Sequence, residues 1–197
     1  ETQAPYAYIR NSKDVYSFNF NVLPETQAKA TFSHTFNNDR TTAKIHIYKV
    51  DKETGKAVPQ GDASLSGAVY GLYAREVINH PDGATGVMFN AGDLVATLTT
   101  DEKGEAEVNN LYLGKYYVKE ITPSEGYLLD EEEHDVVCDY EGDLVAEVSR
   151  STTSAEQVIK QPFQLIKVSD NGDDTEAGLL AGAEFTAYLK SSLSVKA

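Results

Sequence analysis

Cysteine, methionine and tryptophan are scarce in the 197-residue sequence, which has one Cys, one Met and no Trp. The lone thiol of Cys138 excludes an intrachain disulfide, which taken alone favours a reducing compartment such as the cytosol. No apolar run is long enough to span a bilayer. The four histidines show no metal-site spacing, so neither a metal nor another cofactor is expected.

Positive charge is also scarce. Lys and Arg number 17 against 31 Asp and Glu, which gives a formal net charge of −14. Nucleic acids and anionic membranes bind clustered Lys and Arg, so neither is an expected partner. The sequence has no phosphate-binding loop, nucleophile elbow or pair of catalytic carboxylates, and we therefore expect no enzyme activity.

The residues that are abundant favour an all-β fold. Twelve Tyr, seven Phe and fourteen Gly occur in a chain with few stretches of helical period. Residues 44–50 alternate as a strand, with Ile45, Ile47 and Lys49 on one face. Lys49 occupies a position where an apolar residue is expected, and a buried ammonium needs a partner because its desolvation alone costs several kcal/mol.

The strand pattern returns near the end of the sequence, where Phe163, Leu165 and Lys167 share parity 118 residues later. The opening residues 1–6 resemble residues 120–127, which lie 119 residues further on. Intervals of this length indicate repeated domains, because solenoid repeats are shorter. We predict the last strands of one module in residues 1–42, a complete module in residues 43–161 and the first strands of a third in residues 162–197.

Three motifs occur in a family-specific order: residues 49–55 (Lys-Val-Asp-Lys-Glu-Thr-Gly), residues 65–70 (Leu-Ser-Gly-Ala-Val-Tyr), and residues 117–120 leading to Gly126-Tyr127. In this the chain resembles the SpaA/Cna-B-type modules of Gram-positive surface adhesins and pilins. The resemblance implies tandem Greek-key β-sandwiches of the prealbumin-like, or reverse immunoglobulin-like, type. It also outweighs the argument from the single thiol, because exported Gram-positive proteins avoid disulfides.

Many members of this family form an isopeptide bond once, between a first-strand Lys and a last-strand Asn or Asp, with a Glu assisting. The resemblance makes Lys49 the nucleophile and Glu120, on the apolar face of the strand at 111–121, its assistant. However, residues 145–168 hold no Asn or Asp, and Lys160 lies near the expected position of the amide. We therefore predict that Lys49 and Glu120 are buried in contact, without a covalent bond to a third residue.

The resemblance also predicts crosslinking residues in the two flanking pieces, and each piece holds only part of the set. By the resemblance, the upstream piece holds the assisting Glu1 and the amide Asn38, or Asn37 if a bulge shifts the strand. The downstream piece holds Lys167. Unpaired strand edges favour pairing with another chain. Alternatively, a longer protein supplies both missing halves, since the sequence begins inside a motif.

The resemblance implies a stalk or spacer of an extracellular, cell-wall-anchored protein, with the anchor outside this sequence and neighbouring modules as partners. A polymerised pilin backbone would need an acceptor motif such as Tyr-Pro-Lys, which is absent. The alternative is an adhesin module that binds a host protein or glycan. Its contact surface would be the loop at residues 75–93, which has two turn sequences and is predicted to be more mobile than the sandwich.

Overall fold

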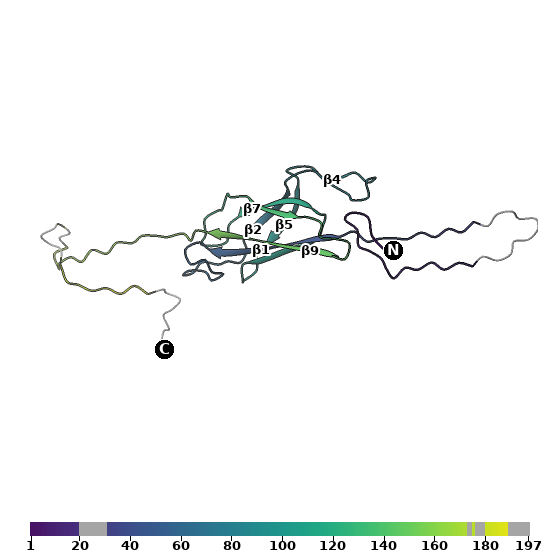
Figure 1. Ribbon diagram of the computed structural model, residues 1–197. Coiled ribbons are helices and arrows are strands. Elements are labelled where there is room, and N and C mark those ends of the chain that lie inside the picture. Colours follow the sequence, from purple (N-terminus) through teal and green to yellow (C-terminus); the bar gives the residue numbers. More distant parts are fainter. Residues whose placement is uncertain (20–30, 173–174, 176–179, 189–197) are drawn as a thin grey trace, which may run out of the picture.

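The computed structural model describes residues 1–19, 31–172, 175 and 180–188 (Figure 1). Within these ranges the chain forms nine strands and no helix, and hence no helix that could cross a membrane. The strands are β1 (Thr42–Asp51), β2 (Val69–Ala74), β3 (Ile78–Asn79), β4 (Val87–Phe89), β5 (Leu94–Thr99), β6 (Glu105–Leu111), β7 (Gly114–Thr122), β8 (His134–Cys138) and β9 (Glu147–Glu156).

The strands form two sheets and a short hairpin. One sheet has the order β6-β1-β9, the other has the order β5-β2-β7-β8, and β3 pairs with β4. In the first sheet, β1 is antiparallel to β6 and parallel to β9. The parallel pairing runs from Thr42 opposite Glu147 to Asp51 opposite Glu156. The arrangement confirms the predicted all-β sandwich.

The central strand β1 shows the predicted alternation of faces. Ala43, Ile45, Ile47 and Lys49 are fully buried, whereas Tyr48 is exposed. Successive side chains of a strand point to opposite faces, so one set enters the core and the other meets solvent. Lys49 is therefore carried inward by the same alternation that buries the isoleucines.

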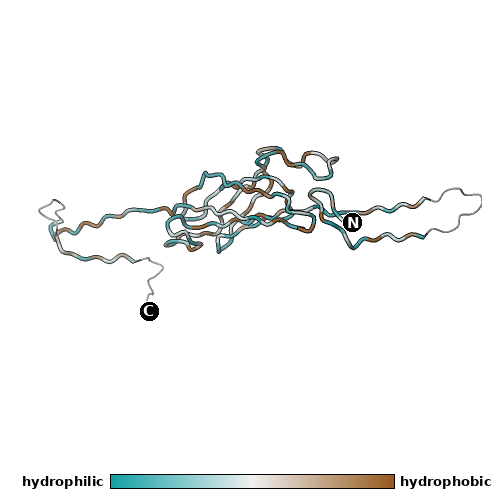
Figure 2. The backbone as a smooth tube through the Cα atoms, viewed as in Figure 1, coloured by the Kyte–Doolittle hydropathy of each residue, from teal (hydrophilic) through white to brown (hydrophobic). Residues whose placement is uncertain are grey.

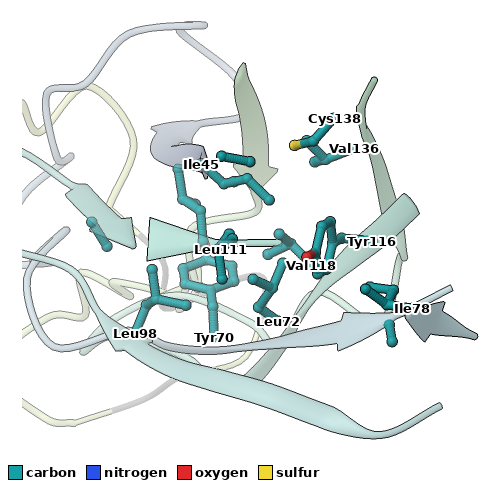
Figure 3. Packing of buried hydrophobic residues seen from close by; sticks show 14 of the residues in the cluster. Ile45, Tyr70, Leu72, Ile78, Leu98, Leu111, Tyr116, Val118, Val136 and Cys138 are labelled. Carbon is teal, nitrogen blue, oxygen red and sulfur yellow. The ribbon is translucent and has the colours of Figure 1, made fainter. Parts of the chain in front are cut away.

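The core lies between the two sheets (Figure 3). Its buried members include Ile45, Tyr70, Leu72, Leu98, Leu111, Tyr116, Val118, Val136 and Cys138. A second, smaller cluster of buried apolar residues consists of Leu65, Tyr127 and Val158. Lys49 belongs to neither cluster, although its ammonium lies 4.8 Å from the centre of the Tyr127 ring. Along β1 it comes between the isoleucines and Asp51, which accepts a hydrogen bond from the Tyr127 hydroxyl.

Several predicted boundaries were wrong. The sequence pattern predicts one strand at residues 144–148 and another that ends near Ile159, but the structure has the single strand β9 there. Leu144 precedes β9 in an exposed turn. The strand expected over residues 111–121 is interrupted between β6 and β7. The loop at residues 75–93 contains β3 and β4, and Ile78 within it packs into the core. These differences arise because turn geometry and tertiary packing set strand ends more strongly than alternation does.

Extended segments leave the sandwich at its two opposite ends (Figure 1). At one end, residues 12–19 and 31–38 run side by side, and the rings of Tyr16 and His34 stack 4.6 Å apart. A single bridge joins Tyr8 to Arg40. At the other end, residues 160–172 extend away with exposed side chains at Phe163, Leu165 and Lys167. The sequence Leu23-Pro24-Glu25-Thr26, which predicts a turn, lies outside the described residues.

Candidate functional site

Three strands bring ionisable side chains together inside the sandwich. Lys49 comes from β1, Glu120 from β7 and Glu156 from β9. The ammonium of Lys49 lies 3.4 Å from Glu120 Oε1 and is in direct contact with Glu156 Oε2. All three side chains have no exposed surface. The predicted contact between Lys49 and Glu120 is confirmed, and a second carboxylate completes the group, which we call the Lys49 cluster.

Glu156 is held in place by hydroxyl groups. The Tyr70 hydroxyl donates to Glu156 Oε1 at 2.5 Å, and the Ser154 hydroxyl lies 3.2 Å from the same oxygen. Ser154 also lies 3.1 Å from Asp130 Oδ2, which in turn contacts a ring nitrogen of His134 at 3.1 Å. Hydrogen bonds of this kind offset part of the cost of removing a carboxylate from water.

Glu120 has its own support on its second oxygen. The backbone N–H of Asp130 donates to Glu120 Oε2 at 2.9 Å. The run of acidic residues 130–135 predicts a solvated loop from its charge, but Asp130 is half-buried there and its backbone supports the Lys49 cluster. Two later acidic residues of this segment, Glu133 and Asp135, do not contact the cluster and form ion pairs with Arg75.

Burial acts on the two ends of the Lys49–Glu120 pair in opposite directions. Desolvation lowers the pKa of Lys49, and the neighbouring carboxylate of Glu120 only partly restores it. Desolvation likewise raises the pKa of Glu120, against the hydrogen bond from Asp130 and the charge of Lys49. Both shifts favour the uncharged forms, which are the forms that amide chemistry between an amine and a carboxyl derivative requires.

Sequence reasoning missed Glu156 because it searched β9 only for an Asn or Asp. The signal was available in the repeat: Asn38 and Glu156 are 118 residues apart, the same interval that separates Lys49 from Lys167. Glu156 thus lies one such interval after Asn38. Lys160, which was expected near this position, is exposed and pairs with Glu53 at 2.6 Å.

The upstream residues Glu1 and Asn38 are also brought together. The Asn38 amide nitrogen donates to Glu1 Oε2 at 2.6 Å and to the Ile9 carbonyl at 2.8 Å. The backbone N–H of Asn11 donates to the same Glu1 oxygen at 2.9 Å. The hydrogen bonds from Asn11 and then Asn38 lower the pKa of Glu1. Glu1, Asn11 and Asn38 line a cavity of about 250 Å³ together with Phe36.

Lys167, the third predicted crosslinking residue, is not near this pair. It is exposed on the segment that leaves the opposite end of the sandwich, and its ammonium donates to the Val168 carbonyl at 3.2 Å (Figure 1). Asn37, the alternative to Asn38, is exposed, and its carbonyl accepts from the Asn11 side chain at 3.3 Å. One molecule therefore assembles Glu1 with Asn38 but leaves Lys167 apart.

The remaining titratable residues form no comparable group. Cys138 is buried, and desolvation raises the pKa of its thiol to about 11, so it packs as an apolar side chain. Each histidine lies near different acidic residues: His34 near Asp14, His46 near Glu105 and Glu107, His80 near Asp82 and His134 near Asp130. Within the described ranges, no cluster of three or more His, Cys, Asp or Glu could hold a metal ion.

A second cavity, of about 300 Å³, lies beside the loop at residues 75–93. Its walls include residues 76–81 of the loop, Tyr112 and Leu113 between β6 and β7, and Tyr6 of the N-terminal segment. The tip of the loop, residues 82–87, is exposed. This cavity does not include any residue of the Lys49 cluster.

Two packed sheets, a parallel β1–β9 pair and an inward lysine on the first strand together define a prealbumin-like β-sandwich domain. The chain belongs to the SpaA family: residues 43–152 match its prealbumin-like fold domain. A comparison with curated proteins found no match.

Solved structures with a similar fold include three from Gram-positive bacteria. The TIE protein of Bacillus anthracis is 24% identical, with a TM-score of 0.43 over 62% of this chain and 18% of its own. The pilus 2b backbone protein of group B streptococcus is 22% identical (TM-score 0.42, coverage 62% and 43%). The minor pilin GBS52 of Streptococcus agalactiae is 23% identical (TM-score 0.40, coverage 64% and 49%). The chain spans less than half the length of each.

Proposed function

We propose that this chain is part of a stalk of a Gram-positive cell-surface protein, and that residues 43–161 form a spacer module that carries tension between its neighbours. The observation that supports this most directly is the β1–β9 pair. Its parallel ladder joins ten residues of each strand, from Thr42 opposite Glu147 to Asp51 opposite Glu156. The chain enters at one end of this pair and leaves at the other (Figure 1).

This geometry decides how a pulling force meets the hydrogen bonds. A force on the chain ends pulls the start of β1 and the end of β9 in opposite directions along the strands. The ladder is then loaded in shear, so that its hydrogen bonds must break together. A force applied to the two strands at the same end would instead break the bonds one after another. A spacer module under tension benefits from the first arrangement.

The Lys49 cluster reinforces the β1–β9 pair that carries the force. Its ammonium joins β1 to the last residue of β9 and to β7 of the opposite sheet. We infer that this lock is ionic and not covalent, in contrast to the Lys–Asn bond implied by the family resemblance. An Asn side chain releases ammonia when an amine attacks it, whereas a carboxyl group must be protonated and lose water to form the same bond. As a carboxylate, Glu156 is instead a good partner for an ammonium.

The proposal also covers the neighbouring modules and the cellular location of the protein. Residues 1–42 and 162–197 would belong to neighbouring modules, which are the partners of the central one, and the protein would be extracellular and held at the cell wall by a segment outside this sequence. Isopeptide bonds would be confined to the flanking modules, where Asn38 supplies the amide. The marked acidity, with a net charge of −14, suits a solvated surface.

Single-molecule pulling in two directions tests the spacer role. Handles on the chain ends load β1 and β9 in shear, and handles on residues 42 and 147 unzip the same pair. We expect a several-fold higher unfolding force in shear. Equal forces in the two directions would refute the proposal that the module is built to carry tension along its length.

A ligand-binding module remains the second candidate, and the cavity beside the loop at residues 75–93 favours it. Tyr6 and Tyr112 offer aromatic surface there, together with polar groups of the loop. Binding to a glycan array or to immobilised host matrix proteins that is lost when residues 81–86 are replaced by a short turn would support this role. An intact binding signal after that replacement would remove the loop from consideration.

A further inference from the structure

The N-terminal segment is packed against the end of the sandwich at which β1 begins (Figure 1). Two stretches of the segment make this contact, residues 4–10 and residues 40–41. They meet residues 110–112, where β6 ends, and residues 140–146 between β8 and β9. We call this contact the joint. It is built from three anchors, each on a different part of the sandwich.

On one side of β1, Arg40 anchors the segment to β6. Its guanidinium donates to the carbonyl oxygens of Leu111 and Asn110, both at 2.8 Å, and to Asn110 Oδ1 at 2.6 Å. The same group lies over the Tyr112 ring, 4.2 Å from its centre. The donors of a guanidinium are fixed in one plane, so a group that both stacks and makes several hydrogen bonds is held in one orientation.

On the other side of β1, the turn before β9 binds residues 4–10. The Asp143 carboxylate accepts a hydrogen bond from the Ala4 N–H at 3.1 Å and lies 3.9 Å from the Arg10 guanidinium. The backbone carbonyl of Asp143 also accepts from the Arg10 N–H at 2.8 Å. One residue of the turn therefore holds residues 4–10 near both of their ends.

The second sheet supplies the third anchor through Tyr140, which follows β8. Its ring lies 4.8 Å from the Tyr6 ring, and its hydroxyl donates to the Tyr8 carbonyl at 3.4 Å. Between these residues, Ala7 is buried with a φ of +64°, and its carbonyl accepts from the Thr41 N–H at 2.8 Å. A left-handed conformation strains a residue other than glycine and persists where the surrounding contacts determine it.

The positions of the three anchors decide which motions remain. A single chain that crosses between two modules acts as a hinge, and relative motion is the default where their contact is small. Here the entering chain continues as β1, which lies between β6 and β9 in its sheet. Arg40 and Asp143 therefore hold the chain from both sides, and Tyr140 holds it from the opposite sheet. Together the anchors oppose bending within the plane of the first sheet and out of that plane.

We propose that the joint is stiff and fixes the direction of the preceding module relative to the central sandwich, so that the stalk does not bend at this boundary. Residues 12–19 and 31–38 continue from the joint, with apolar residues interspersed among polar ones (Figure 2). They leave the sandwich along one fixed direction. The inference rests on the proposed division into modules but not on the spacer's resistance to force, which the pulling experiment tests separately.

The distance between two spin labels in the full chain, measured by pulsed electron paramagnetic resonance, tests this stiffness. The labels are attached through Lys13→Cys, next to the joint, and Lys103→Cys, in the exposed turn between β5 and β6. The thiol of Cys138 is buried and does not take up the label. We expect a single narrow distance distribution. Arg40→Ala combined with Asp143→Ala should widen it roughly twofold or more, because the hinge motion of a weakly supported chain is then restored.

Arg75→Ala combined with Asp82→Ala is the matched control. The Arg75 guanidinium also lies over a ring, that of Tyr117 at 4.0 Å, and pairs with carboxylates outside the joint. Asp82 accepts from backbone N–H groups at the tip of the loop at residues 75–93, as Asp143 does in the joint. This double variant should keep the narrow distribution of the wild type. A broad distribution in the wild type would overturn the proposal, and so would an unchanged width in the Arg40 and Asp143 variant.

Hydrogen exchange of backbone amides provides a second reading on the same proteins. The Arg10 and Thr41 amides, which donate within the joint, should be protected in the wild type and exchange faster in the Arg40 and Asp143 variant. The amides of β2 should stay protected in both, which shows that the sandwich remains folded. Free exchange of Arg10 and Thr41 in the wild type would contradict a stiff joint.

Discussion

At the scale of single residues, the buried ammonium of Lys49 balances the charge of the cluster. It compensates two carboxylates that have no exposed surface, and those carboxylates come from different strands. Buried ion groups of this kind contribute little net stability compared with apolar residues, but the loss of one partner is costly. Lys49 is thus the residue whose removal leaves the most unbalanced charge.

Lys49→Met tests this balance. With both glutamates retained, we expect the free energy of unfolding, measured by urea denaturation, to fall by about 3–5 kcal/mol, because two carboxylates remain buried without a cation. Lys49→Met combined with Glu120→Gln and Glu156→Gln should be milder than the single change. Lys103→Met, in the exposed turn between β5 and β6, is the control and should lie within about 0.5 kcal/mol of the wild type. If Lys49→Met leaves the free energy of unfolding unchanged, the charge of Lys49 does not stabilise the cluster.

Asp51 gives the module a predictable response to acid. Burial alone would raise its pKa, but hydrogen bonds from Thr54, Gln60 and Tyr127 outweigh burial and hold the pKa below the ordinary value of 3.8. A depressed carboxyl pKa stabilises the fold above the unfolded-state pKa, and that stabilisation is lost as the pH falls through the folded-state value.

Asp51→Asn should therefore be less stable than the wild type at pH 7, with a difference that narrows as the pH falls below 3.8. Thermal unfolding of both proteins across this range measures the effect. A difference that stays constant with pH would mean that the ionised carboxylate is not the stabilising form.

At the scale of structural elements, the turn between β5 and β6 is closely fitted to β1. Gly104 has a φ of +77°, and a Cβ added there would lie 2.7 Å from the Lys49 carbonyl oxygen. The Gly104 carbonyl also accepts a hydrogen bond from the Lys49 N–H at 2.8 Å. The turn and the strand that carries the lysine are thus positioned by the same contact.

We expect Gly104→Ala to destabilise the module by roughly 2–4 kcal/mol, since the new methyl adds a steric clash to the cost of a left-handed residue. Gly83→Ala is the matched comparison, because Gly83 has a φ of +68° with open space around it and should lose only about 1 kcal/mol. Urea denaturation of both variants separates the two contributions. Equal losses would show that the approach of the turn to β1 is not tight.

Some of these elements could be predicted from the sequence and others could not. The alternation in residues 44–50 and the inward parity of Glu120 were enough to predict strands β1 and β7 and the contact between Lys49 and Glu120. Glu156 was missed because an Asn or Asp was expected there, although the 118-residue interval from Asn38 points to it. Its alignment opposite Asp51 could not be predicted, because the parallel register of β9 against β1 is a tertiary property. The role of the Asp130 backbone was also out of reach, since a loop conformation decides which N–H meets Glu120.

At the scale of the whole molecule, the chain is a central sandwich with an extended segment at each end (Figure 1). At one end Glu1 and Asn38 are joined by a hydrogen bond, and at the other end Lys167 is exposed. The central sandwich holds the Lys49 cluster, in which one lysine contacts two glutamates. The fold therefore places an ion group inside the central sandwich and leaves the side chain of Lys167 exposed outside it.

The measurement that tests the central claim most directly is the length released when the central module unfolds under end-to-end tension. An ionic lock lets all of Thr42–Glu156 extend, which at about 3.5 Å per residue gives a gain on the order of 350 Å. The unfolding event should require a high force, and the Lys49→Met variant should unfold at a lower force. A gain close to zero would contradict the account, because it would mean that a covalent bond between Lys49 and Glu156 shields the intervening chain.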